Sequence, residues 1–170
     1  MPIEIERKFL VTSNEWRTLG KAVAIRQAYL SKTEKSTTRI RIYGEKAYLT
    51  IKGKSFANCA RLEYEYEIPI ADAEEILTHL TTGWVIFKER TRIPYNGHII
   101  EVDEFFNENQ GLVIAEIELS KINEHIDDKP IWLGDEVTHL GRYSNAALAS
   151  HPYSTWSDDE KAGVDSIKNV

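Results

Sequence analysis

Hydrophobic and polar residues alternate along most of this chain. A period of two is typical of β-strands, because successive side chains of a strand point to opposite faces of the sheet. The alternating runs predict eight strands, at residues 3–10, 24–31, 37–43, 46–53, 60–69, 85–93, 98–105 and 113–120. The dipeptide Asn96-Gly97, between two of these runs, predicts a tight hairpin turn.

A helical period is present in only a few segments. Residues 71–80 predict an amphipathic helix with Ile76, Leu77 and Leu80 on its apolar side and Asp72 near its start. Shorter helices are expected at residues 13–19, 133–138 and 144–150.

The length of 170 residues is enough for one domain with a sizeable core. We find neither internal repeats nor a linker-like stretch, and the residues after position 150 are polar and aperiodic. We therefore expect a single domain at residues 1–150 and a polar C-terminal tail at residues 151–170.

The overall charge narrows the classes of partner. The net charge is -6 and the isoelectric point is about 5.4, which argues against nucleic-acid binding, since such proteins expose a basic surface. No stretch is long enough to span a bilayer or to serve as a signal peptide. Cys59 is the only cysteine, so we expect an inert packing residue and no internal disulfide. We expect a cytoplasmic protein without membrane partners, and a homodimer stays open.

Like charges are paired on the polar faces of the predicted strands. A sheet half exposed to water explains one polar face on any single strand. It does not explain like charges about 6.5–7 Å apart on the same face, because they repel each other. The pairs are Glu4 and Glu6, Arg39 and Arg41, Glu63 and Glu65, Lys88 and Arg90, Glu101 and Asp103, and Glu116 and Glu118.

A closed barrel with a charged interior accounts for pairs of both signs. Eight strands enclose a space that side chains can line. Carboxylates from neighbouring strands would converge on a hard divalent cation such as Mg²⁺ or Mn²⁺, and the arginines and lysines would bind a polyanion. That combination suits phosphoryl transfer. The sequence has no glycine-rich phosphate-binding loop, so P-loop chemistry is not expected.

The segment Glu4-x-Glu6-x-Lys8 resembles the signature of the CYTH superfamily, also called the triphosphate tunnel metalloenzymes. Alone the motif would be weak, but further segments follow in the family's order across about residues 2–149. They are Arg39-Ile40-Arg41, Thr50-Ile51-Lys52, Arg61-Leu62-Glu63-Tyr64-Glu65, Lys88-Glu89-Arg90, Glu101-Val102-Asp103, Glu116-Ile117-Glu118, Trp132 to Thr138 and Arg142 to Asn145.

The resemblance implies an α+β fold, in which an eight-stranded antiparallel β-barrel forms a charged tunnel with a few flanking helices. It also implies a phosphohydrolase that needs Mg²⁺ or Mn²⁺ and acts on a small-molecule triphosphate. Small bacterial inorganic triphosphatases are the members that this chain resembles most.

The same resemblance assigns roles to individual residues. The expected metal ligands are Glu4, Glu6, Asp103, Glu116 and Glu118. The expected phosphate ligands are Lys8, Arg39, Arg41, Lys52, Arg61, Lys88, Arg90 and Arg142. The expected catalytic residues are Lys8 with Tyr29, which would assist as a pair, and Glu63 and Glu65, which would hold or activate the attacking water or help to bind a second metal.

Some of these residues also have an ordinary structural interpretation. Tyr29 could be an aromatic residue that packs in the barrel. Arg142 could cap the helix that follows it instead of reaching the tunnel mouth. We expect Trp16, Trp84 and Trp132 to form core or helix–barrel contacts.

Several functions stay open at this point. Hydrolysis of inorganic triphosphate is favoured, because a tunnel lined by charge offers little for a base or a thiazolium ring to stack on. Thiamine triphosphate and ATP are alternative substrates. A class IV adenylate cyclase is a further alternative, although Pro2-Ile3 replaces the His-Phe pair that often precedes the motif in those cyclases. The last alternative is a non-catalytic module that binds polyphosphate or nucleotides.

Overall fold

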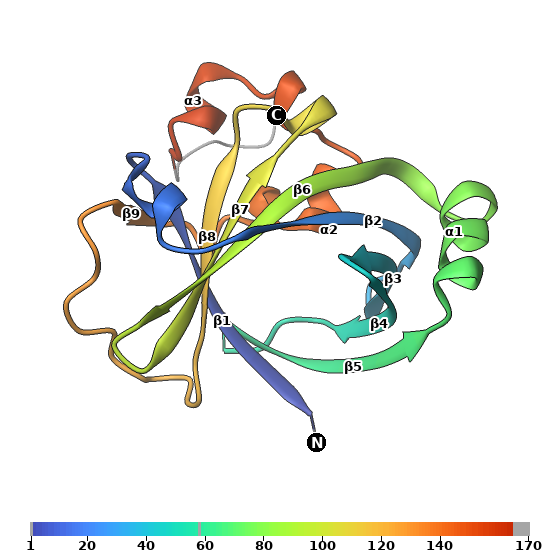
Figure 1. Cartoon of the computed structure of the whole chain (residues 1–170), viewed down its shortest axis with the longest axis horizontal. Helices are drawn as coiled ribbons and strands as arrows, with labels where there is room; N and C mark the ends of the chain where they lie inside the picture. Colours follow the sequence, from blue (N-terminus) through green and yellow to red (C-terminus); the bar gives the residue numbers. More distant parts are fainter. Residues whose placement is uncertain (1, 58, 165–170) are drawn as a thin grey trace.

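The computed structural model describes residues 2–57 and 59–164 (Figure 1). Its main feature is a sheet with the strand order β5-β4-β3-β2-β6-β7-β8-β1, which closes on itself because β5 also pairs with β1. Every one of these pairings is antiparallel. The strands are β1 (Ile3–Val11), β2 (Ala22–Lys32), β3 (Ser36–Tyr43), β4 (Lys46–Gly53), β5 (Ala60–Ile68), β6 (Thr82–Tyr95), β7 (His98–Phe105) and β8 (Val113–Glu118). The expected eight-stranded antiparallel barrel is confirmed, and each predicted run overlaps one of these strands.

Strand β1 closes the barrel because it pairs with β5 along one edge and with β8 along the other. Its first residues pair with β5, where Glu4 lies opposite Arg61, and its later residues pair with β8, where Lys8 lies opposite Glu116. Directly opposite residues of an antiparallel pair share one face of the sheet. The seam of the barrel therefore places charged side chains of three strands on its inner face.

The hairpin between β6 and β7 turns at Asn96-Gly97, as predicted. Asn96 has φ +47° and Gly97 has φ +79°. A two-residue hairpin turn of type I′ needs a positive φ at both positions, which asparagine and glycine tolerate best.

Most of the hydrophobic core lies on the outer face of the barrel, but Ile86, Phe105 and Ile114 share the inner face with the charged residues and belong to a separate cluster. One cluster places Trp16 and Trp132 against Phe9, Val102 and Ala115 of β1, β7 and β8. Both tryptophans are 3% exposed, which confirms the expected packing role. Trp84 is 51% exposed, so the same expectation is wrong for that residue.

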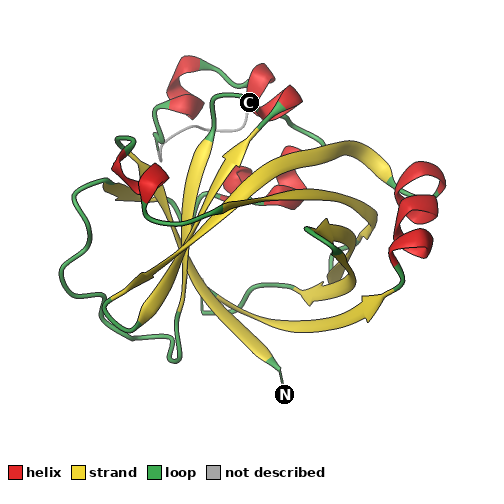
Figure 2. Ribbon diagram, viewed as in Figure 1, coloured by secondary structure: helices red, strands yellow, loops and turns green. Residues whose placement is uncertain are grey.

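Helix α1 (Ile70–His79) confirms the amphipathic helix expected at residues 71–80. It covers the outer face of β2, β3 and β4 at one side of the barrel, with Ala73 and Leu77 in the shared core (Figure 2). Leu80 follows the last helical residue and is 61% exposed, so its expected place on the apolar side is wrong.

The remaining helices are short. They are the 3₁₀ helices η1 (Glu15–Thr18), η2 (Asn107–Asn109), η3 (Gly141–Tyr143) and η4 (Tyr153–Thr155), and the α-helices α2 (Asn145–Leu148) and α3 (Asp158–Lys161). The helices expected at residues 13–19 and 144–150 correspond to η1 and α2.

The helix expected at residues 133–138 is wrong, because this segment contains strand β9 (Leu133–Glu136), which pairs with β1. Arg7 of β1 binds the Glu136 carboxylate with N–O distances of 2.6 and 2.8 Å. A Cβ atom at Gly134 would lie 2.8 Å from Cγ2 of Thr12 and 3.2 Å from the carbonyl oxygen of Leu10, so β1 leaves no room for a side chain there. Four residues are too few to define a period, so pairing with β1 decides the conformation of this segment.

The segment after residue 150 packs on the barrel as far as the structure describes it. Trp156 is 5% exposed and makes edge-to-face contacts with Tyr143 and Tyr153, at centroid distances of 5.0 and 5.1 Å. The last part of the predicted tail, residues 165–170, lies outside the described residues. Among the described residues, no helix is both long enough and apolar enough to cross a membrane.

Candidate active site

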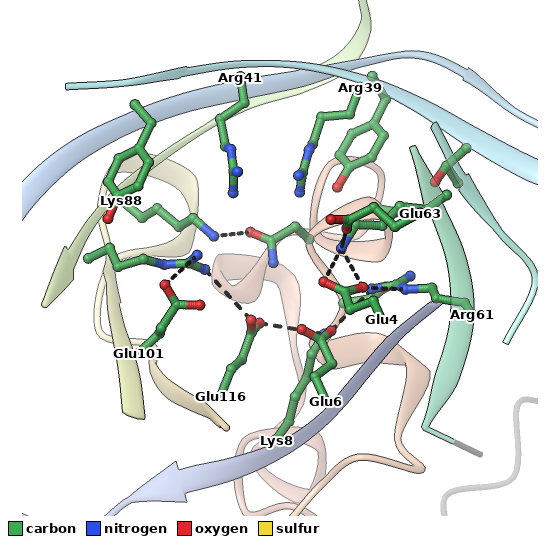
Figure 3. Close-up of a pocket in the computed structure, with 18 of the residues that line it drawn as sticks. Glu4, Glu6, Lys8, Arg39, Arg41, Arg61, Glu63, Lys88, Glu101 and Glu116 are labelled. Carbon is green, nitrogen blue, oxygen red and sulfur yellow. Dashed lines mark hydrogen bonds and ion pairs between the residues drawn. The ribbon is translucent and has the colours of Figure 1, made fainter. Parts of the chain in front are cut away.

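The inner face of the barrel encloses a cavity whose walls are mostly charged (Figure 3). The described part of the chain contributes no leucine, isoleucine, valine or phenylalanine to these walls. The basic lining residues are Lys8, Arg39, Arg41, Lys52, Arg61, Lys88, Arg90 and Arg92, and the acidic ones are Glu4, Glu6, Glu63, Glu101 and Glu116. Eight basic groups against five acidic ones leave an excess of three positive charges in a protein whose net charge is -6. The cavity, which we call the tunnel, is therefore suited to a polyanion.

Strand register explains why these side chains converge. Glu116 of β8 lies opposite Lys8 of β1 on one side and opposite Glu101 of β7 on the other. Opposite residues share a face, so one inward-facing residue fixes the orientation of its neighbours around the barrel. The like-charge pairs thus become rows on the inner face, although Glu65, Asp103 and Glu118 do not line the tunnel itself.

Two arginines of β3 carry donors without partners. Nε of Arg39 and Nε of Arg41 are buried and have no hydrogen-bond partner among the described residues. Their other contacts reach Glu65, at 3.7 Å from Arg39 and 3.2 Å from Arg41. Burial lowers the pKa of Arg41, and the neighbouring Arg39 lowers it further. Buried donors of this kind usually have a partner, so their arrangement favours binding of an anion in the tunnel.

The acidic residues near the seam are held by cations. Nζ of Lys52 lies 2.9 Å from a carboxylate oxygen of Glu4 and 2.9 Å from one of Glu63. Arg61 reaches Glu4 at 3.1 Å and Glu6 at 3.2 Å. The network therefore places carboxylates, which suit a metal ion, directly beside lysine and arginine side chains, which suit phosphate.

Lys8 and Tyr29 line the same tunnel without contacting each other directly. Nζ of Lys8 lies 3.8 Å from both Glu6 and Glu116. Tyr29 is 4% exposed and lines the tunnel as well. No hydrogen bond joins the two side chains in the part of the chain that the structure describes. Their expected cooperation would therefore act through a group bound between them.

Asp103 is buried behind the tunnel wall, although it was expected to be a metal ligand. Its carboxylate is 1% exposed and contacts Nζ of Lys88 at 2.8 Å and Nε of Arg90 at 2.7 Å. These two cations hold the pKa of Asp103 below its ordinary value against the effect of burial, which raises it. Asp103 therefore orients two tunnel cations and does not itself line the tunnel.

Glu101 lies on the same face of β7 and does line the tunnel. Burial raises its pKa, and Glu116 adds to this effect, while Arg90 at 3.2 Å opposes it. The sequence placed Glu101 and Asp103 on one face, but it did not show which of them reaches the tunnel.

Glu118 continues the acidic row of β8, lies opposite Glu6 of β1 and is exposed. Burial of part of its side chain and the nearby carboxylates of Glu4 and Glu101 raise its pKa. The nearby carboxylates repel the charge of Glu118, and a divalent cation would relieve that repulsion. Among the described residues, no three acidic, histidine or cysteine side chains are arranged as a ready metal site. The donor chemistry fits a hard cation, although lysines and arginines now hold several of the donors.

Two further candidates lie elsewhere. Glu65 accepts a hydrogen bond from Thr50 at 2.9 Å and contacts the two β3 arginines, but it does not line the tunnel. Arg142 donates to the backbone carbonyls of Glu160 and Val164, so it binds the C-terminal segment instead of the tunnel. Its expected role as a phosphate ligand is not supported by these contacts.

The structure adds residues that sequence patterns did not assign to the site. Gln27 is fully buried beside the tunnel and donates to Asn145, which lines it from α2. Gln27 lies two residues before Tyr29 in β2, so the two share one face of the strand, which is a usable signal. Asn145 lies in a short helix, and no periodicity pointed to it.

Comparisons with known proteins agree with this architecture. The family model for the CYTH domain matches residues 2–149. An inorganic triphosphatase of Acetivibrio thermocellus is 45% identical over 155 residues, which cover 91% of this chain and 98% of that protein. An inorganic triphosphatase of Nitrosomonas europaea is 36% identical over 150 residues, which cover 86% and 96%.

A solved structure gives the same result for the fold. The crystal structure of an inorganic triphosphatase superposes with a TM-score of 0.63 at 32% identity. The match covers 88% of this chain and 95% of that one. The similarity therefore extends over most of both chains.

Proposed function

The chain belongs to the CYTH domain family, and on this basis we propose that it is a metal-dependent phosphohydrolase that hydrolyses inorganic triphosphate in its tunnel. Two inorganic triphosphatases that share 45% and 36% of their residues with this chain support this substrate. The match to them extends over nearly the whole length of each protein, so no large substrate-binding part is left out of the comparison.

The excess of three positive charges on the tunnel wall carries the proposal. A triphosphate that carries one divalent cation has a net charge of about -3, so it is attracted to a wall on which basic side chains outnumber acidic ones. The guanidinium ends of Arg39 and Arg41 point into the tunnel (Figure 3) and would donate to phosphate oxygens. Lys8, Lys52, Arg61, Lys88 and Arg90 would bind the remaining phosphate oxygens.

The divalent cation, Mg²⁺ or Mn²⁺, would be held by the carboxylates of Glu4, Glu6, Glu116 and Glu118, with Glu101 next to them. When bound, it neutralises charge on the phosphate oxygens and lowers the barrier to attack. Asp103 would act from behind the wall by fixing Lys88 and Arg90. Hard oxygen donors of this kind are the ligands that both cations prefer.

The reaction needs a water molecule oriented toward the terminal phosphorus. The oxygen of this water forms the new bond to phosphorus, and the bond from phosphorus to the bridging oxygen breaks, which yields orthophosphate and pyrophosphate. Glu63 lines the tunnel and would orient the water, whereas Glu65 would hold the β3 arginines. Lys8 and Tyr29 would assist from the opposite strands by donating to the leaving oxygen.

The tunnel walls disfavour a nucleotide as the main substrate. Among the described residues, the aromatic side chains in the walls are Tyr29 and Tyr43, and the remaining lining groups are charged, hydroxyl or amide groups and one alanine. An adenine or thiazolium ring gains most from stacking on apolar or aromatic surface. Inorganic triphosphate needs only charge and hydrogen bonds.

A metal-titrated assay of phosphate release tests the proposal. It compares inorganic triphosphate, thiamine triphosphate and ATP with Mg²⁺ or Mn²⁺, and it measures cyclic AMP in parallel. We expect the highest kcat/KM for inorganic triphosphate and no activity after chelation of the metal. Cyclic AMP formed without phosphate release would identify a cyclase, and no turnover of any of the three would identify a binding module.

A further inference from the structure

Helix α2 brings one amide side chain into the wall of the tunnel. Ser144 caps the helix, since its hydroxyl accepts a hydrogen bond from the backbone nitrogen of Ala147 at 3.1 Å. The cap directs the first turn so that Ser144, Asn145 and Ala146 line the tunnel among the charged strand residues. Asn145 is the only one of these three with a planar side chain that both accepts and donates hydrogen bonds.

The oxygen of the Asn145 amide is fully used. It accepts from Nε2 of Gln27 at 2.9 Å and from Nζ of Lys88 at 3.0 Å. Both donors are buried, with exposures of 0% for Gln27 and 2% for Lys88. A lysine ammonium group donates only, so the opposite orientation of the amide would set its NH₂ group against Lys88. The contact with Lys88 therefore fixes which side of the amide faces away.

The nitrogen of the same amide is left with its donors free. No side chain or backbone group in the described chain accepts a hydrogen bond from Nδ2 of Asn145, although the residue lines the tunnel. Two N–H donors thus stand in a cavity whose walls carry more basic than acidic side chains, with Arg39 and Arg41 among them. This combination is suited to phosphate oxygens, which only accept.

We propose that Asn145 is a phosphate-binding residue of the tunnel that also positions Lys88: its oxygen holds the lysine, and its NH₂ group donates to a phosphate oxygen of the bound triphosphate. The inference rests on the proposed function and adds a ligand from outside the barrel strands. A neutral amide suits both contacts, because a carboxylate there would hold Lys88 but repel the substrate.

The position of α2 is itself fixed by the barrel. The backbone nitrogen of Trp84, at the start of β6, donates to the carbonyl of Ala149 at 2.8 Å. Lys32 of β2 donates to the carbonyl of Ala146 in α2. Asn145 is therefore held between two strands, as precise placement of a ligand requires.

Asn145→Asp and Asn145→Ala separate the two contacts. The aspartate keeps an acceptor for Lys88 but loses the donor, whereas the alanine loses both. Asn123→Asp, which introduces the same charge at an exposed loop residue away from the tunnel, is the matched control. Binding of inorganic triphosphate is measured by calorimetry with the metal chelated, so that no turnover occurs, and kcat and KM are measured with metal.

We expect Asn145→Asp and Asn145→Ala each to weaken triphosphate binding and raise KM by about 10-fold or more, while Asn123→Asp matches the wild type. Wild-type binding and KM in Asn145→Asp would overturn the role as phosphate ligand. If the wild type itself does not turn over or bind triphosphate, the proposed function fails instead. Circular dichroism verifies that each variant is folded, and Asn145→Asp serves as the test if Asn145→Ala does not fold.

Discussion

Arg90 donates two hydrogen bonds to the carboxylate of Asp103, from Nε at 2.7 Å and from a terminal nitrogen at 2.8 Å. This forked pair is buried behind the tunnel wall, and Lys88 adds a third contact at 2.8 Å. One carboxylate thus fixes two cations whose other sides face the tunnel. A fork of this kind constrains the guanidinium plane as well as its position.

Asp103→Asn is expected to reduce both stability and activity. The amide is nearly the same size, but it leaves two buried cations with less compensation, which should cost about 3 kcal/mol of unfolding free energy. Because Lys88 and Arg90 lose their fixed positions, kcat/KM for triphosphate should fall by about 10-fold or more. Urea denaturation and steady-state kinetics measure the two effects.

Glu104→Gln is the matched control for this variant. Glu104 is the next residue of β7 and binds Arg17 at the surface, so the same chemical change should cost less than about 1 kcal/mol. Equal urea midpoints for Asp103→Asn and Glu104→Gln would contradict the structural role of the buried fork.

The roles of Glu101 and Asp103 show how far sequence patterns reach. Alternation placed both carboxylates on the inner face of one strand, and the barrel confirms this. How deeply each side chain is buried depends on the cations of β6. Arg90 binds Asp103, which does not line the tunnel, whereas Glu101 does. Side-chain pairing across two strands depends on the length and charge of both partners. The alternation along one strand describes only one of the two partners, so it does not predict the pairing.

Elements that depend on distant contacts were predicted less well. Strand β9 has four residues and exists because β1 offers an edge and Arg7 binds Glu136. Arg142 is directed to backbone carbonyls near the C-terminus, and the sequence gives no pattern for those contacts. Long, strictly alternating runs were predictable because each of them carries its own period.

The pair of Arg7 and Glu136 should give a pH-dependent contribution to stability. The hydrogen bond from Arg7 lowers the pKa of Glu136 below its ordinary value of 4.5. A lowered pKa in the folded state adds stability above pH 4.5, and this stability is lost as the pH falls through the lower, folded-state value. Glu136→Gln should therefore be less stable than the wild type at about pH 7, and the gap should narrow toward about pH 3.

Urea midpoints of the wild type and Glu136→Gln across this pH range measure the effect. Glu45→Gln removes one exposed carboxylate in a hairpin turn and controls for the change in net charge. A gap between wild type and Glu136→Gln that stays constant with pH would argue against the ion pair as its source.

Gly83→Ala should displace helix α2. Gly83 has φ +73°, and a Cβ atom there would lie 2.6 Å from the carbonyl oxygen of Ala149. The strained backbone and the contact together should cost about 2 kcal/mol. Because α2 carries Asn145, the shift should also lower kcat/KM for triphosphate.

Gly97→Ala separates backbone strain from displacement of the helix. Gly97 has φ +79° but nothing within 4 Å of the added Cβ, and it lies in the hairpin between β6 and β7. We expect a loss of about 1 kcal/mol and unchanged kinetics. A Gly83→Ala variant with wild-type kinetics would show that the position of α2 does not affect the tunnel.

Glu118→Gln should separate activity from stability. Burial and the carboxylates of Glu4 and Glu101 raise the pKa of Glu118, so its negative charge is unfavourable in the metal-free protein. Removing that charge should leave the free energy of unfolding within about 1 kcal/mol of the wild type or raise it slightly. If Glu118 helps to hold the divalent cation, the same change should lower kcat by about 100-fold and raise the Mn²⁺ concentration needed for half-maximal activity.

Glu67→Gln, at an exposed glutamate that pairs with Lys46 outside the tunnel, should change neither quantity. Glu118→Gln with wild-type kcat and wild-type Mn²⁺ dependence would exclude Glu118 from the metal site, and the same titration on Glu101→Gln would then show whether β7 supplies the ligand instead.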